Sequence, residues 1–324
     1  MRAAFGAALF AMAIGITAGD GALAADAFPN RPIKIIVNTA PGGFTDLMAR
    51  LAAQHMGEYL KQPVIVDNRA GGDGLIAIRF VKSSPADGYT LLAATGTAAQ
   101  QMALRQDPGY DLVKDFAGIG IITRTPFLMV VGVGQPDKTV ADFVARAKAN
   151  PGKLTFASAG VGTVPHFASE RFLQSLGVKV MHVPYKGNAP ALPDVISGRV
   201  DMIFDTYGSS IGQIKAGQFR VLGVTSSARL PVLPDVKTLA EQGAPGYSYY
   251  TWVCLLAPAG TPPEIIQRLS DALKYAKAKG EVKERFRNEG MESVDMTPVQ
   301  FNQFLANEVT QNQKIVADLH LEKQ

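Results

Sequence analysis

Short apolar runs recur along almost the whole chain, and their length and spacing limit the folds that it can adopt. The run 33–37 is typical, because four of its five residues are Ile or Val. Continuous apolar runs of this length are typical of strands that are buried on both faces of a sheet. We expect such strands at 33–37, 64–66, 89–93, 127–133, 154–157 and 180–183.

Amphipathic stretches separate these runs and carry apolar residues at the spacing of a helix face. We expect helices at 45–59, 140–149, 166–176, 191–196, 263–279 and 298–318. Strands that alternate with helices predict an α/β fold with mainly parallel sheets.

Two apolar strands, 126–133 and 249–258, divide the chain into an N-terminal part, a central block and a C-terminal tail. The tail has little strand material of its own, so we expect it to pack on the N-terminal part. The sequence therefore predicts two lobes with a ligand cleft between them. Residues 25–125 and 248–324 form the discontinuous lobe 1, and residues 126–247 form lobe 2.

The first residues carry the pattern of an export signal. Arg2 precedes an apolar run, 3–18, that is too short to span a bilayer comfortably, and the small-residue pattern Ala22-Leu23-Ala24 follows it. We interpret residues 1–24 as a signal peptide. No later stretch reaches the apolar length that a membrane span needs, so we expect the mature chain to be exported and soluble.

The charge balance is mildly basic. The chain has 32 Lys and Arg against 28 Asp and Glu, a net charge of +4, and loss of residues 1–24 leaves it unchanged because Arg2 and Asp20 cancel. This excess favours an anionic ligand. The basic residues are scattered, without the clusters that follow a phosphate backbone, so we do not expect nucleic-acid binding.

Cysteine and histidine usage argues against a disulfide or a metal site. Cys254 is the only cysteine, and its apolar run, 253–257, predicts a buried thiol rather than a nucleophile. The histidines show no metal-ligand spacing such as H-E-x-x-H. We therefore expect no metal and no cofactor. The four histidines are His55, His166, His182 and His320.

The first expected strand leads into a glycine-containing loop and then a helix. Gly42 and Gly43 allow the backbone to approach a ligand closely, and Thr45 or Asp46 is expected to cap a helix whose free N–H groups attract anions. Paired glycines also occur in loops that merely turn the chain, so this motif alone leaves both roles open.

The central block repeats the arrangement. A strand leads into Ser158-Ala159-Gly160-Val161-Gly162-Thr163 and then a helix. Two lobes that each present a helix N-terminus would hold the charged end of a ligand from both sides. Neither loop is a dinucleotide fingerprint, since Pro165 stands where G-x-G-x-x-G requires glycine, and no G-x-x-x-x-G-K-[ST] occurs.

Four more polar residues of the central block have an open role. Tyr185 and Lys186 follow a strand and either face the cleft or belong to a solvated loop. Asp205, at the end of another strand, either contacts a ligand or caps the next helix. His166 lies near the start of a helix, where a structural hydrogen bond is the alternative to ligand contact.

An ordered series of motifs resembles the tripartite tricarboxylate transporter substrate-binding family, also called the Bug receptors. Each motif is weak by itself, but the series spans residues 28–266 in the family's order. The motifs are PNRPIKIIV, PGGFTDLMAR, VDNRAGG, ADGYTLLAA, KDFAGIG, SAGVGTVPHFASE, VPYKGNAPALPDVISGRVDMIFD, RVLGVTSSARLPVLPDVKTLAEQGAPG and LLAPAGTPPEII.

This resemblance implies a monomeric periplasmic protein of the type II, Venus flytrap fold that binds a small organic acid and works with membrane permease subunits. In the family, the loop that matches Gly42, Gly43, Phe44, Thr45 and Asp46 and the loop that matches 158–163 close around a carboxylate. They do so mainly through backbone amides and hydroxyls. The segment that matches Phe204 and Asp205 borders the pocket.

Two departures from the family's pattern concern the ligand. The family commonly has Pro-Phe before the first glycine loop, whereas this chain has Asn38-Thr39. A roomier or more polar pocket is expected where an aromatic ring is replaced by a hydroxyl. The run of small polar residues after YTLL is Ala94-Thr95-Gly96-Thr97 here, and the following residues are atypical. The particular acid therefore does not follow from the resemblance.

Two other functions compete with transport. An envelope enzyme on the same fold would use Ser158 as nucleophile and His166 or Asp205 as general base, but the chain has no G-x-S-x-G elbow or other triad signature. We therefore expect no catalytic residues. A receptor that presents its liganded form to a sensor kinase would have the same sequence features as one that serves a permease.

Overall fold

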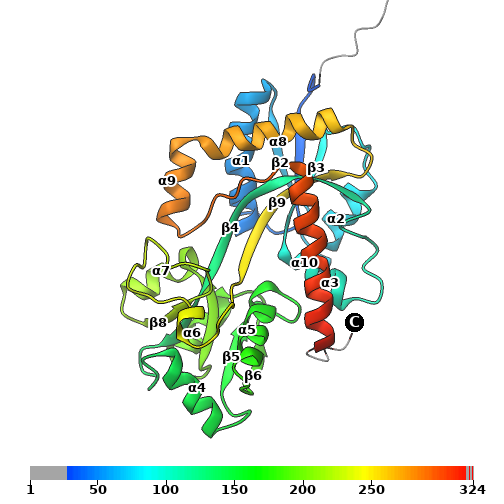
Figure 1. Cartoon of the computed structure of the whole chain (residues 1–324). Coiled ribbons are helices and arrows are strands. Elements are labelled where there is room, and N and C mark those ends of the chain that lie inside the picture. The colour runs from blue at the N-terminus through cyan, green and yellow to red at the C-terminus, as the bar shows by residue number, and fades with distance from the viewer. Residues whose placement is uncertain (1–27, 319–320, 322, 324) are drawn as a thin grey trace, which may run out of the picture.

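Two lobes linked by two long strands make up the part of the chain that the structure describes (Figure 1). The computed structural model describes residues 28–318, 321 and 323. The signal peptide expected at 1–24 lies outside these residues.

The upper lobe in Figure 1 contains three parallel strands, with β1 between β2 and β3. Helices from both ends of the chain cover it. Its N-terminal elements are β1 (Ile33–Val37), α1 (Phe44–Leu60), β2 (Val64–Asn68), α2 (Leu75–Lys82), β3 (Thr90–Thr95) and α3 (Gly96–Leu104). Its C-terminal elements are α8 (Pro263–Ala278), α9 (Gly280–Asn288) and α10 (Pro298–Asp318).

The lower lobe has its own parallel set, in which β5 lies between β6 and β7. Strand β8 pairs with the linking strand β4 in an antiparallel direction. The elements are α4 (Val140–Ala149), β5 (Thr155–Ser158), α5 (Val164–Ser175), β6 (Met181–Pro184), α6 (Leu192–Ile196), β7 (Met202–Thr206), α7 (Tyr207–Lys215) and β8 (Phe219–Val224). Short 3-10 turns lie at Gly72–Gly74, Ala189–Ala191 and Ala240–Gln242.

Strands β4 (Phe116–Gly132) and β9 (Tyr250–Pro258) run antiparallel to each other and connect the lobes. Strand β4 continues beyond its pairing with β9 to pair with β7 in the lower lobe. The sheet is therefore mixed: it is parallel within each lobe, as the sequence predicts, and antiparallel wherever a linking strand takes part.

Apolar side chains fill both faces of each lobe's sheet. In the upper lobe, α1 and α8 pack on one face and α2, α3 and α10 on the other. The tail thus packs on the N-terminal part, as the sequence predicts. Cys254 is fully buried in this core, and burial raises the pKa of its thiol, which confirms a structural role.

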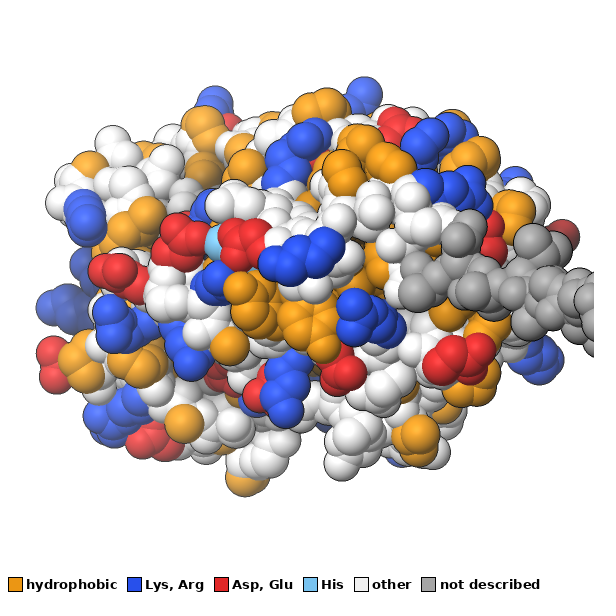
Figure 2. Space-filling view, turned by 90° about the horizontal axis from the view of Figure 1, so that it is seen from above, with side chains coloured by type: hydrophobic (Ala, Val, Ile, Leu, Met, Phe, Trp, Pro, Cys, Tyr) orange, Lys and Arg blue, Asp and Glu red, His pale blue; other side chains and the backbone are white. Residues whose placement is uncertain are grey.

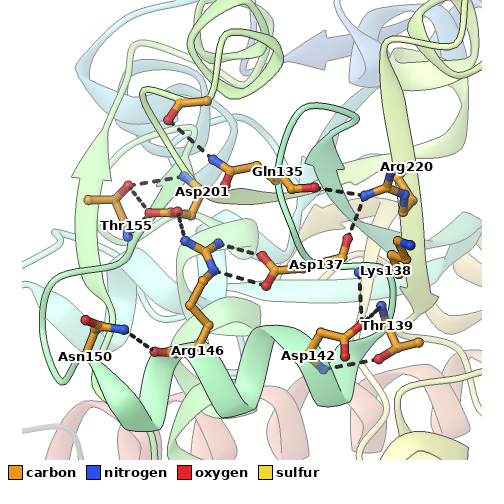
Figure 3. A network of polar contacts seen from close by, with 11 residues as sticks. Gln135, Asp137, Lys138, Thr139, Asp142, Arg146, Asn150, Thr155, Asp201 and Arg220 are labelled. Carbon is orange, nitrogen blue, oxygen red and sulfur yellow. Dashed lines mark hydrogen bonds and ion pairs between the residues drawn. The ribbon is translucent and has the colours of Figure 1, made fainter.

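A buried ionic network stabilises the lower lobe (Figure 3). Arg146 on α4 donates from Nε to Oδ1 of Asp137 at 3.0 Å and from NH1 to Oδ1 of Asp201 at 2.6 Å. The Asp137 side chain is only 2% exposed. Asp201 also accepts from the backbone N–H of Thr155 at 2.8 Å. One guanidinium therefore holds α4, the segment before it and the start of β7 together.

The surface shows mixed charge. On the face that Figure 2 shows, Lys and Arg side chains lie between Asp and Glu side chains rather than in one stripe. This distribution agrees with the scattered basic residues of the sequence. Among the described residues, no helix combines the length and the apolar character that crossing a membrane requires.

Candidate functional site

A cavity of about 630 Å³ lies between the lobes, where strands of both parallel sets end. Ligands of open α/β sheets bind at the carboxyl ends of strands, and pockets for small molecules commonly measure about 300–1,000 Å³. We call it the ligand cavity. It is lined by Asn38, Thr39, Ala40, Gly71, Gly74, Thr95, Thr97, Gln101, Ala159, Gly160, Val161, Thr163, Tyr185 and Lys186.

The upper wall begins with the loop after β1. Gly42 has φ +81°, and a Cβ atom there would meet nothing within 4 Å, so the loop is open on that side. The cap of α1 differs from the sequence prediction: Gly43 is the N-cap residue, and no side chain caps it. Thr45 and Asp46 lie inside the first turn instead. The first N–H groups of α1 therefore have no partner within the helix.

Asp46 supports this loop from below. Its carboxylate accepts from the Gly42 N–H at 2.9 Å, from Asn68 Nδ2 at 2.9 Å and from Arg50 Nε at 3.0 Å. Burial alone would raise the pKa of Asp46, but these hydrogen bonds and the Arg50 charge outweigh it and hold the pKa below its usual value. Asp46 stays ionised as a support, and the structure places it beneath the loop, where it does not line the ligand cavity.

Another helix of the upper lobe, α3, starts at the ligand cavity. Helix α3 follows β3 directly, with Thr95 as its N-cap residue and no side-chain hydrogen bond at the cap. Thr95 and Thr97 both line the ligand cavity. The N-terminus of α3 thus reaches the cavity with unpaired N–H groups, beside the loop that precedes α1.

The lower wall is the loop between β5 and α5. Gly160 and Gly162 have φ +128° and +74°, which side chains with a Cβ atom rarely adopt. Thr163 is the N-cap residue of α5, yet its hydroxyl donates to the Gly160 carbonyl at 2.7 Å, so the N–H groups of the first turn stay uncapped. This wall therefore presents a second helix start, that of α5, to the cavity.

An imidazole stack supports the lower loop from inside. His166 and His182 stack with ring centroids 4.1 Å apart, and Phe156 stacks on His182 at 4.8 Å. His166 Nδ1 accepts from the Gly162 N–H at 3.2 Å, and His182 Nε2 lies 2.6 Å from Ser158 Oγ. Burial lowers the pKa of His182 to about 4, and burial together with the His182 charge lowers that of His166 to about 3. Both rings are neutral near pH 7.

Acid should destabilise the protein through this stack. An unperturbed histidine has a pKa of about 6.5. Between pH 6.5 and about 4 the two rings are therefore protonated in the unfolded chain but remain neutral in the folded one. The free energy of unfolding consequently falls as the pH falls through that window. Each ring can lower the free energy of unfolding by at most about 1.4 kcal/mol per pH unit. Thermal unfolding at pH 7 and pH 5 measures this loss. The loss of stability should be smaller in the double variant His166→Asn/His182→Gln than in the wild type. An equal loss in the variant and the wild type would contradict the role given to the two histidines.

Asp205 and Tyr185 are held by side-chain partners. Asp205 is 1% exposed, accepts from Asn188 Nδ2 at 2.8 Å and receives a hydrogen bond from Ser210 Oγ. It is therefore engaged within the lower lobe. Tyr185 lines the ligand cavity, and its hydroxyl donates to Asp194 Oδ2 at 2.6 Å; burial and this hydrogen bond raise the pKa of Tyr185 to about 12.

Of the sixteen candidate ligand-binding residues, seven line the ligand cavity. The lining set is Thr39, Thr95, Thr97, Ala159, Gly160, Thr163 and Tyr185. Phe44 lines a neighbouring cavity of about 570 Å³ between α1, α7 and α9. Gly42, Gly43, Thr45, Asp46, Ser158, Gly162, His166 and Asp205 line neither of these cavities.

Several lining residues, among them Gly71, Gly74 and Gln101, were not named as ligand contacts from the sequence. Gly71 and Gly74 follow β2 and Gln101 lies on α3. Gly71 is the first glycine of VDNRAGG, which follows a strand just as the other two glycine loops do, and that is the signal that could have found this segment. For Gln101 the sequence offers no such signal, because the start of α3 lacks apolar periodicity.

Two oxygens beside the cavity lack partners. Asn38 Oδ1 and Thr39 Oγ1 are buried and form no hydrogen bond with a described residue. An unpaired buried polar atom costs about 1–3 kcal/mol, which a ligand could recover. Among the described residues that line the cavity, only Lys186 is charged, and it is exposed. Negative charge in this cavity would therefore meet mainly backbone N–H groups.

Comparison with known proteins decides the family. The family model described as "Tripartite tricarboxylate transporter family receptor" matches residues 48–321. The chain belongs to this receptor family. Members of the family are solute-binding proteins, so the resemblance noted in the sequence is confirmed.

Solved structures agree with this receptor's fold. The periplasmic binding protein BugD is 30% identical, with a TM-score of 0.79, over 92% of this receptor and 100% of BugD. A Rhodopseudomonas palustris protein solved with adipate is 34% identical, with a TM-score of 0.80, over 90% and 97% of the two chains. MatC from the same organism, solved with malate, is 30% identical, with a TM-score of 0.78, over 89% and 100%. The receptor has their two-lobed periplasmic binding protein fold.

Proposed function

We propose that this receptor captures a small organic acid in the ligand cavity and delivers it to the membrane subunits of a tripartite tricarboxylate transporter. The observation that carries the proposal is the meeting of two uncapped helix N-termini, α3 of the upper lobe and α5 of the lower lobe, at one cavity that the loop before α1 also lines. Helix N-termini attract anions, and the adipate and malate in the related structures are both dicarboxylates.

Backbone N–H groups would bind the ligand's carboxylate without a dedicated cation. Each charge-assisted hydrogen bond contributes about 1.5–3 kcal/mol. Because α5 belongs to the lower lobe and α3 to the upper one, a carboxylate that contacts both helix starts favours the closed form. Affinity and lobe closure thus have the same origin.

Asn38 and Thr39 point to a ligand that carries a hydroxyl or amino group besides its acid. Their unpaired oxygens lie next to the cavity. A polar ligand group would pair with these oxygens, whereas a purely aliphatic acid would leave them unsatisfied. A hydroxylated acid is therefore preferred to its deoxy analogue.

The remaining expectations follow from this role. The mature chain would act in the periplasm as a monomer, with lobe 1 formed by 25–125 and 248–324 and lobe 2 by 126–247. The site residues named above act as ligand contacts or as supports of the loops. A sensor kinase is the alternative partner, because it would read the same closed form.

A thermal-shift panel tests the proposal. Mono-, di- and tricarboxylates, each with its methyl ester and with hydroxylated and deoxy members, are added to the purified receptor. At least one acid should raise the unfolding temperature while its ester does not, because only the acid offers charge to the helix N-termini. Stabilisation by esters or neutral sugars alone would contradict carboxylate capture.

An enzymatic role has one observation in its favour, the 2.6 Å contact between Ser158 Oγ and His182 Nε2. Ser158 is fully buried, however, and burial lowers the pKa of His182 to about 4, which makes it a weak base. No described carboxylate forms an ion pair with His182. NMR of the best acid or its ester after overnight incubation with the receptor should show the compound unchanged. Conversion of the compound would show that the protein is an enzyme rather than a binding protein.

A further inference from the structure

A second cavity, of about 200 Å³, lies between α5 of the lower lobe, β9 and α10. It shares no lining residue with the ligand cavity. We call it the α10 cavity. One water occupies about 30 Å³ of liquid, so this space equals about seven waters and suits a molecule smaller than most drug-like ligands.

Aromatic rings form much of its wall. Trp252 on β9 and Phe304 on α10 contact edge to face, with centroids 5.8 Å apart. Tyr249 and Tyr250 add two further rings, and Ile315 closes the side near the end of α10. Such a wall accepts an apolar group, or an organic cation that lies over the face of a ring.

Two opposite charges face this space without pairing. Arg171 on α5 forms no hydrogen bond or ion pair with any described residue, and its guanidinium carbon lies 6.0 Å from the centre of the Tyr249 ring. Glu308 on α10 accepts from Trp252 Nε1 through Oε2 at 3.1 Å, and its Oε1 bonds to no described residue. A third charged residue, Arg124, is already paired with Glu292, Nε to Oε2, at 2.7 Å.

The surroundings of Glu308 disfavour its charged form. Burial raises the pKa of Glu308, and the Trp252 hydrogen bond and the Arg171 charge only partly offset the effect. Partly buried charges are costly unless they are paired. A cation alone in the cavity would be repelled by Arg171, and an anion alone by Glu308. A ligand with both charges would satisfy the two residues at once.

We propose that the α10 cavity is a second binding site, for a small zwitterionic amino acid with an apolar side chain. Its carboxylate pairs with Arg171, its ammonium pairs with Glu308, and its side chain packs against Trp252 and Phe304. The site is distinct from the ligand cavity, and both lobes contribute to it.

Calorimetry with three molecules that share a 3-methylbutyl group tests the two charges. L-leucine carries both, 4-methylpentanoate lacks the ammonium and 3-methylbutylamine lacks the carboxylate. Leucine should bind at least tenfold more tightly than either analogue. An analogue that binds as tightly as leucine, or no heat of leucine binding at about 10 mM, would overturn the proposal.

Variants locate the binding. Arg171→Met and Glu308→Gln should each weaken leucine binding at least tenfold; Gln keeps an acceptor for Trp252, and an unchanged unfolding temperature shows that either variant is folded. Thr97→Asp, which places a charge in the ligand cavity, should leave leucine binding unchanged. The reverse pattern, with leucine lost in Thr97→Asp and kept in the other two, would place leucine in the ligand cavity and refute the second site.

Discussion

Replacing Thr97 by aspartate should weaken binding of the organic acid at least about 100-fold, or about 2.8 kcal/mol. Thr97 lines the ligand cavity in the first turn of α3, so the new carboxylate would lie where the ligand's own is proposed to bind. Like charges brought together in this way cost several kcal/mol. Calorimetric titration of the best acid from the panel measures the change.

The matched control is Thr97→Asn, which has the same shape without the charge. It should bind the acid within about threefold of wild type. An acidic residue near a helix N-terminus is favourable, so Thr97→Asp should fold as well as the control. If both variants lose the acid equally, the loss comes from shape rather than charge. Full binding by Thr97→Asp would place the carboxylate elsewhere.

Removing the guanidinium of Arg146 should lower the free energy of unfolding by about 3–5 kcal/mol, because Asp137 would remain buried without its cation. This loss is a large share of the 5–15 kcal/mol that typically stabilises a domain. Urea unfolding of Arg146→Met measures it.

Two further variants distinguish the contribution of the buried ionic network from the effect of removing any cation from α4. Lys148→Met removes an exposed cation from the same helix and should change stability by less than about 0.5 kcal/mol. Adding Asp137→Asn to Arg146→Met should recover part of the loss, since it removes the uncompensated charge. Equal losses in Arg146→Met and Lys148→Met would show that the buried network contributes little.

The sequence predicted the elements whose signals are local. Strand β1 and helices α4 and α10 have the predicted bounds. A capping box starts α4, where Thr139 Oγ1 accepts from the Asp142 N–H and the Asp142 side chain accepts from the Thr139 N–H. A capping box of this kind can be recognised in the sequence from the spacing of its two residues alone.

Four of the described helices escaped prediction, and two of them have weak apolar periodicity at their start. Helices α2, α3, α7 and α9 were not foreseen: α3 begins Gly-Thr-Ala-Ala and α7 begins Tyr-Gly-Ser-Ser, so neither start shows an apolar face. The first ten residues of β4 were missed as well. They include Gly118 and Gly120, which flank a register shift in the pairing with β9.

For the site, the sequence located the loops but not their supports. Gly42 to Asp46 and 158–163 are recognisable because glycines precede each helix. The bonds from Asn68 to Asp46 and between Ser158 and His182 join residues 22 and 24 positions apart. No local pattern encodes such contacts, since they depend on which strands become neighbours in the sheet.

The most direct measurement of carboxylate capture is a calorimetric titration of the wild-type receptor with its best acid and with the methyl ester of that acid. The helix N-termini of α3 and α5 predict saturable one-to-one binding of the acid and at least about 100-fold weaker binding of the ester. Equal affinity for acid and ester would contradict the account.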